Sequence, residues 1–130
     1  MNKEIKSYNA TLADGDKKIT NKLMKVIDEN LNATESKIWH RHPVWFINEN
    51  PIVGYTKLKA GVRLMFWSGI DFAEPLLLPG TGKFKDASML YTTVKEINEA
   101  DVIRWLNKAE KIQWDYKNIV KRKGKLERLK

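Results

Sequence analysis

Hydrophobic residues between positions 16 and 31 recur every three or four residues, which is the spacing of one face of an α-helix. The apolar positions are Ile19, Leu23, Val26, Ile27 and Leu31. Lysines and acids occupy most of the positions between them, so the helix is amphipathic and packs on another layer. We predict a helix over residues 16–31 and a flexible N-terminus over residues 1–15, which are mostly polar.

The pattern changes to β-strand character after position 37. We predict strands over 38–47, 52–58, 62–67 and 86–94, joined by a turn at 48–51 and a short hairpin connection at 59–61. Pro43 argues for an edge position or a bulge in the first strand, because proline cannot donate a ladder hydrogen bond. Residues 70–85 hold two prolines and two glycines, which indicates a long surface loop whose leucines tuck under the domain.

A second helix is predicted from Asn98, an N-cap residue followed by acids in the first turn. Its apolar stripe runs from Val102 to Val120, and Trp105 and Trp114 flank it. The predicted fold class is α+β: an antiparallel sheet of about four to five strands, with an N-terminal and a long C-terminal helix packed on one face. Residues 16–124 form a single domain, and residues 125–130 form a basic C-terminal tail.

Alternation along the strands sorts their side chains onto two faces of the sheet. One set is aliphatic or Phe and is expected beneath the helices: Ile52, Leu58, Val62, Leu64, Phe66 and Leu90. The other set mixes aromatic rings, thioethers and cations: Val53, Tyr55, Lys57, Arg63, Met65, Trp67, Met89 and Tyr91. This second face could be covered by the 70–85 loop, form a groove for a small ligand or extended partner, or pair with a second copy of the chain.

The net charge of +8 is concentrated at the C-terminus. The last fourteen residues carry seven basic side chains against Glu127 alone, which is +6 and leaves +2 for the other 116 residues. A basic end of this kind suits either a solvated helix terminus or contact with a polyanion. Nucleic acid is therefore an alternative partner, held through the basic C-terminal helix and tail.

Composition excludes several functional classes. The chain has no cysteine, so it has no disulfide, thiolate metal site or cysteine nucleophile. No apolar run is long enough to span a bilayer and no secretory signal is present, so we expect a cytoplasmic protein without a membrane partner. Pro79–Lys83 departs from a phosphate-binding loop, because Leu77 and Phe84 stand where that motif needs Gly and Ser or Thr. No arrangement of residues nominates a reaction, so we expect a binding protein rather than an enzyme.

Two histidines are the candidate metal ligands. His40 and His42 lie two apart on the predicted first strand and would project to the same face. Imidazole suits iron, zinc or copper, although a catalytic zinc site takes three protein ligands. The alternative is that both are polar histidines of an edge strand beside Arg41.

Four segments, taken together, resemble the YdhG-like (YdhG/YdeI-like) family of small bacterial cytosolic domains. They are ESKIWHRHPVWF, NPIVGYTKLKAGVRLMFWSG, LLLPGTGKFKDASMLYTTV and IQWDYKNIVKRKG, and the likeness covers residues 19–124. The resemblance implies an α+β fold with helices before and after an antiparallel sheet. One family member is described as a frataxin-like iron chaperone, which implies iron as a possible cargo. Frataxin-type binding uses an acidic ridge, whereas the predicted first helix offers only Asp16, Asp28 and Glu29 among four lysines.

These observations predict a single-domain, non-catalytic protein, monomeric or homodimeric, that binds a small molecule or a metal ion. The expected contact surface consists of Trp45, Tyr55, Arg63, Trp67, Lys83 and Tyr91. Rings would supply stacking area, and the cations Arg63 and Lys83 would hold an anionic or polar group. No cofactor is expected, apart from iron at His40 and His42.

Overall fold

Two of the helices follow directly from the apolar stripes. The computed structural model describes residues 2–130. Helix α2 (Asp14–Asn30) buries Ile19, Leu23, Val26 and Ile27, which confirms the first predicted helix. Helix α3 (Glu99–Lys111) begins after Asn98, whose side chain accepts a hydrogen bond from the Asp101 N–H at 3.2 Å. No helix among the described residues is both long and apolar enough to cross a membrane.

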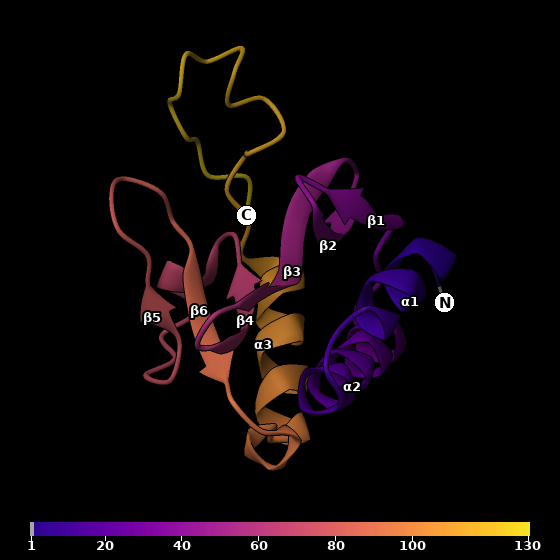
Figure 1. Ribbon diagram of the computed structural model, residues 1–130. Coiled ribbons are helices and arrows are strands. Elements are labelled where there is room, and N and C mark those ends of the chain that lie inside the picture. Colours follow the sequence, from indigo (N-terminus) through magenta and orange to yellow (C-terminus); the bar gives the residue numbers. More distant parts are fainter. Residues whose placement is uncertain (1) are drawn as a thin grey trace.

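The sheet has six strands in the spatial order β1-β2-β3-β4-β6-β5, and every neighbouring pair is antiparallel. The predicted α+β class is confirmed, with slightly more strands than expected. The strands are β1 (Glu35–Trp39), β2 (His42–Ile47), β3 (Asn50–Leu58), β4 (Gly61–Phe66), β5 (Leu78–Pro79) and β6 (Ala87–Tyr91). Short 3₁₀ turns lie at η1 (Gly69–Asp71) and η2 (Val94–Glu96). Figure 1 shows α2 and α3 on the same side of this curved sheet.

The N-terminal segment is a helix, so the expected flexible stretch over residues 1–15 is wrong for the part that the structure describes. Helix α1 (Lys3–Ala10) is capped by Asn2, and its Ile5 is fully buried. Asn9 is also buried, and its Oδ1 accepts a hydrogen bond from the Tyr55 hydroxyl at 2.7 Å. Ile5 alone does not form an apolar stripe, so the hydrophobic pattern of residues 3–10 does not predict a helix. Met1 lies outside the described residues.

The predicted strand over 38–47 is two strands joined by a tight turn. His40 and Arg41 both have positive φ, at 51° and 73°, so β1 folds back onto β2. Asn48 and Glu49 repeat this geometry between β2 and β3, with φ of 50° and 70°. Two-residue hairpin turns with both φ values positive match the twist of the strands, but Asn-Gly or Asp-Gly usually marks them. His-Arg carries no such signal, which is why the first turn was missed.

The two faces of the sheet differ from the predicted sets because of the β3–β4 hairpin. Leu58 pairs with Gly61 across a two-residue connection, where a three-residue connection was expected. Tyr55 therefore lies opposite Leu64 and Val53 opposite Phe66, all on the face that the helices cover. A one-residue change of register moves every side chain of a strand to the other face. Leu58 and Leu90, expected in the core, are exposed instead.

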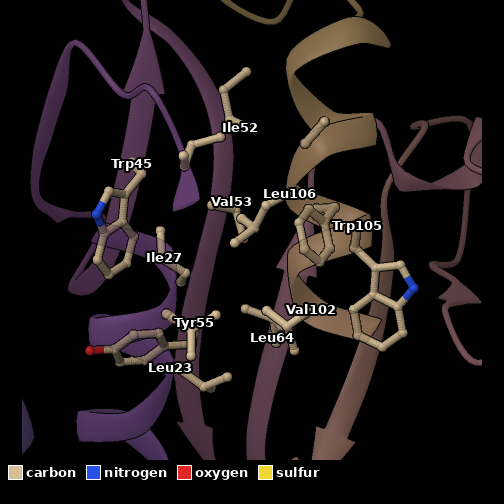
Figure 2. Close-up of a cluster of buried hydrophobic side chains, with 14 of the residues drawn as sticks. Leu23, Ile27, Trp45, Ile52, Val53, Tyr55, Leu64, Val102, Trp105 and Leu106 are labelled. Atoms are coloured by element: carbon tan, nitrogen blue, oxygen red, sulfur yellow. The ribbon is translucent and has the colours of Figure 1, made fainter. Parts of the chain in front are cut away.

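The core lies between this covered face and helices α2 and α3. Figure 2 shows the rings of Trp45 and Tyr55 beside Leu23 and Ile27 of α2, with Trp105 of α3 at the opposite end of the cluster. Two ring donors at its edges have carboxylate partners: the Trp45 Nε1–H donates to Asp28 Oδ1 at 2.7 Å, and the Trp105 Nε1–H donates to Glu74 Oε1 at 2.8 Å. The large rings thus contribute apolar area to the interior while their polar atoms find partners.

The chain after α3 forms turns instead of the predicted helix through Val120. Asn50 at the start of β3 explains the change, because its Oδ1 accepts the N–H groups of Tyr116 and Lys117 at 2.9 and 3.0 Å. Its Nδ2 also donates to the Trp114 carbonyl at 2.9 Å. These tertiary hydrogen bonds take backbone groups that a continuing helix would need.

The basic tail folds back beside the end of α3. The Leu129 N–H donates to the Gln113 carbonyl at 2.8 Å, and the Asp115 N–H donates to the Glu127 carbonyl at 2.7 Å. In Figure 1 this segment forms the yellow loop that projects beyond α3 and returns to it. The basic residues of the tail are therefore held near the 80–86 region rather than trailing away from the domain.

Candidate functional site

A cleft opens on the sheet face away from α2 and α3, which we call the open face. It lies across β2, β3 and β4 and encloses about 380 Å³, solvent at its mouth included. We call it the tryptophan cleft. It is lined by Trp39, His40, His42, Pro43, Val44, Gly54, Tyr55, Thr56, Arg63, Met65 and Trp67. Most of the surface of the cleft is apolar.

Two indole rings and the backbone of β3 form the apolar part of the cleft. The Trp39 and Trp67 ring centroids are 6.2 Å apart at an angle of 45°, and Trp39 also packs edge-on against Phe46 at 5.5 Å. Gly54 lies beneath them: a Cβ there would stand 2.5 Å from the Pro43 carbonyl oxygen and 3.3 Å from the Trp67 ring. Glycine at this position therefore lets β2 and the Trp67 indole approach the backbone closely.

The polar end of the cleft is cationic. His42 Nδ1 lies 2.7 Å from the Thr56 hydroxyl, across the β2–β3 pair. Burial lowers the pKa of His42 below its ordinary 6.5, and the nearby charges of Arg63, His40 and Arg41 lower it further. None of the described residues that line the cleft is an acid. The polar end would consequently favour an anionic or hydrogen-bond-accepting group over a cation.

Arg63 is half-buried beside His42 and lacks an ion-pair partner among residues 2–130. Its Nε is shielded from solvent and has no hydrogen-bond acceptor within the part of the chain that the structure describes. Three other arginines each pair with a carboxylate: Arg104, Arg122 and Arg128. A guanidinium left without an acceptor in a largely apolar cleft is costly for the free protein.

The histidines do not make a suitable metal site. His40 lies in the turn and His42 at the start of β2, rather than two apart on one strand as predicted. Across residues 2–130, no group of three His, Asp or Glu side chains gathers at metal-binding distances. Arg63 and Arg41 add positive charge next to His42, which opposes a divalent or trivalent cation. The residues present therefore do not fit the iron cargo that the family resemblance implies.

A second cleft continues the first across the sheet toward the C-terminal segment. It shares Trp39, His40, Met65 and Trp67 with the tryptophan cleft and adds Phe84, Asp86, Tyr116 and Ile119. The Phe84 and Tyr116 rings are 6.4 Å apart, and the Tyr116 hydroxyl accepts the Lys85 N–H at 2.9 Å. Burial raises the pKa of Tyr116 to about 12, so this hydroxyl stays neutral. The 70–85 loop thus forms one wall here and does not cover the open face.

The structure brings together only part of the predicted contact surface. Arg63 and Trp67 line the tryptophan cleft, and Lys83 lies in the adjoining loop. Trp45, Tyr55 and Tyr91 have their side chains in the core, at 1%, 2% and 1% exposure, so the prediction that these rings form the contact surface is wrong, although Tyr55 borders the tryptophan cleft. Strand register decides this, because Trp45 lies opposite Val53, Tyr55 opposite Leu64 and Tyr91 opposite Val62, all on the covered face.

Sequence reasoning missed several residues that shape the groove. Trp39, Gly54, Thr56, Phe84 and Tyr116 were not predicted as site residues, although they line one or both clefts. Reading the connection at 59–60 as a two-residue hairpin would have placed Gly54 and Thr56 on the face of Arg63 and Met65. Tyr116 carries no such local signal, because its position depends on contacts with Asn50, 66 residues away.

Comparison with protein-family models, with curated proteins and with solved structures gives no match to this chain.

Proposed function

We propose that this is a cytoplasmic, non-catalytic protein that binds a small molecule with a planar apolar body and an acidic group. The ligand would occupy the tryptophan cleft. The observation that carries the proposal is Arg63, a half-buried guanidinium without a carboxylate partner among residues 2–130, in a cleft walled by indole rings.

The apolar body of the ligand would contact Trp39, Met65 and Trp67. The tilted indole rings of Trp39 and Trp67 each present a flat surface on which another ring can stack, and Met65 adapts to the outline of that ring. The part of the cleft that the protein encloses is about 80 Å³, below the range for small-molecule pockets, so a ligand of one or two fused rings would lie partly in solvent.

The acidic group of the ligand would lie against Arg63 and His42. A guanidinium binds a carboxylate or phosphate through two parallel hydrogen bonds, and this pairing is stronger where water is excluded. His42 would add a second positive charge if it takes up a proton when the anion binds. Because no acid lines the cleft in the part of the chain that the structure describes, no carboxylate of these residues competes with the ligand for the two cations.

The His42–Thr56 pair supports binding over catalysis. A hydroxyl 2.7 Å from an imidazole resembles a nucleophile and its base. However, Thr56 is buried, and the structure gives His42 no hydrogen bond to a carboxylate within the described chain. A third group that orients the base is part of working triads. The pair therefore serves better to hold β2 against β3 at the base of the cleft.

The test uses indole-3-acetate as the first probe, followed by a panel of other aromatic carboxylates and phosphates. Binding would be followed by quenching of tryptophan fluorescence and by chemical shifts of the Trp39 and Trp67 indole N–H signals. The Arg63→Ala variant should weaken binding by about tenfold or more, as expected for loss of a charged hydrogen-bonding partner. Arg41→Ala is the matched control: Arg41 carries the same charge in the adjacent turn and acts on His42 only through that charge, but it is exposed and does not line the cleft, so its loss should weaken binding much less than the loss of Arg63.

Three outcomes would count against the proposal. No saturable binding by any aromatic anion of the panel would remove it, and so would equal losses in the two arginine variants. Saturable binding of Fe(II) that is lost in His40→Ala/His42→Ala, without aromatic-anion binding, would favour the iron function over it.

A further inference from the structure

Two lysine-bearing loops that are far apart in the sequence converge beside Trp114. One loop carries Lys83 and Lys85, and the other carries Lys123 and Lys125. Together they line an open cleft, which we call the lysine cleft, with Trp114, Gly124 and Leu126 completing its surface. The Lys83 ammonium lies 3.7 Å from the place where a Cβ on Gly124 would stand, so the two loops are in close contact.

Trp114 anchors this arrangement. Its backbone N–H donates to the Ser68 hydroxyl at 2.9 Å, and its indole N–H donates to Asp71 at 2.6 Å. The Lys85 ammonium lies 4.7 Å from the ring centroid, and the Arg128 guanidinium lies 5.8 Å from it. The indole therefore holds a cation from each loop beside it through cation–π contacts.

The four lysines of the cleft have no compensating acid. None of them forms an ion pair with any residue from 2 to 130. Of the nearby acids, Asp71 is engaged with Trp114 and Arg128, and Glu127 with Arg122; Asp86 follows Lys85 in the chain but lines the neighbouring cleft with Phe84 and Tyr116. Like charges gathered in this way repel one another, and an anion between them would relieve the repulsion.

The chemistry of the lining favours a repeating polyanion over a single bound phosphate. The backbone N–H groups of Lys85, Gly124 and Lys125 already donate to Tyr116, Ile119 and Arg122. No arginine fork lines the cleft among the described residues, so only flexible ammonium groups face the opening. Ammonium groups of this kind contact phosphates as point charges, and they bind chiefly by releasing the counterions of a charged polymer.

We propose that the lysine cleft binds the phosphodiester backbone of a nucleic-acid strand. The contacts come from two loops that the fold brings together, rather than from the tail alone. This site is separate from the tryptophan cleft and does not depend on a ligand there. Because ammonium groups read charge and not base edges, binding would show little sequence preference.

The test measures the binding of fluorescently labelled oligothymidylate to the full chain by anisotropy over a range of salt concentrations. The test variant replaces Lys83, Lys85, Lys123 and Lys125 by Gln. Each phosphate contact to a single strand contributes about 0.7 to the slope of log affinity against log salt, so the slope should fall by about 3. The control variant removes the same charge elsewhere, at the exposed positions Lys18, Lys25, Lys59 and Lys95. Circular dichroism and indole-3-acetate binding should be the same in both variants as in the parent chain.

The expected result is a large loss of slope and affinity in the lysine-cleft variant and a small loss in the control. Equal losses in the two variants would show that net charge alone drives binding, which overturns the site. Displacement of the strand by inorganic tripolyphosphate at equal phosphate concentration would assign the cleft to free oligophosphates instead. Absence of binding at low salt would also overturn the proposal, and none of these outcomes bears on the tryptophan cleft.

Discussion

The burial of Tyr55 can be tested directly, and the test decides which face of β3 lies in the core. In the structure its hydroxyl donates to Asn9 Oδ1 at 2.7 Å, and Asn9 Nδ2 donates in turn to Asn21 at 3.0 Å. The Tyr55→Phe variant removes the hydroxyl, keeps the ring, and leaves the buried Asn9 Oδ1 without its donor. A buried hydrogen bond contributes about 1 kcal/mol net, and an unsatisfied partner adds to the loss. We expect the free energy of unfolding to fall by about 1–2 kcal/mol.

The measurement is urea denaturation of Tyr55→Phe, Asn9→Ala and the double variant, followed by circular dichroism. The two side chains are in contact, so their effects should not add, and the coupling energy should be about 1 kcal/mol. Burial also raises the pKa of Tyr55 well above its ordinary 10. As pH rises, Tyr55 therefore loses its phenolic proton in the unfolded chain before it does so in the folded protein. The free energy of unfolding should fall above pH 10, and it should fall less steeply in Tyr55→Phe, which lacks this proton. Additive effects, or no loss in Tyr55→Phe, would place the ring on the open face and refute the register.

Three further predictions follow from single sites. Gly54→Ala should lower the free energy of unfolding by about 1–3 kcal/mol in urea denaturation, because its Cβ would collide with the Pro43 carbonyl; an unchanged midpoint would contradict this packing. Glu74→Gln should lower the free energy of unfolding at neutral pH, because Arg104 and Lys108 lose their carboxylate partner. The contacts with Arg104 and Lys108 lower the pKa of Glu74 in the folded protein, so the difference in unfolding free energy between variant and parent should shrink as pH falls below 4.5. Indole-3-acetate affinity should rise as pH falls below 6.5, because His42 gains a proton beside the bound anion, and calorimetry of a His42→Ala variant should show a flat profile.

Local patterns were sufficient for most of the secondary structure. The stripe of α2 and the Asn98 cap of α3 are properties of neighbouring residues, and both were predicted. The failures lie where distant contacts override the local pattern. The hydrophobic pattern predicts that the second helix continues past Ile112. In the structure, the backbone N–H groups of Tyr116 and Lys117 donate to Asn50 Oδ1 instead of to carbonyls of a helix. Helix α1 is missed for the opposite reason, since its burial depends on partners such as Tyr55.

The candidate site was predicted only in part for a related reason. Arg63 and Trp67 were placed on the correct face, because both follow the hairpin turn. Tyr55 precedes that turn, and one residue in the length of the connection moved it to the core. Turn length depends on backbone φ values and strand twist, which the side-chain pattern near residues 59–61 does not reveal.

The amino-acid sequence by itself determined the α+β class, the positions of the main helices and strands, and the excess of positive charge near the C-terminus. Hydrophobic period, capping residues and composition act over a few neighbouring positions, so they can be evaluated without the fold. The tertiary structure alone decided which rings are buried, that Arg63 lies beside the indoles with no ion-pair partner among residues 2–130, and that lysines of two loops meet at Trp114. Each of these depends on strand register and on contacts between residues far apart in the chain, where a shift of one position changes the partner of every side chain.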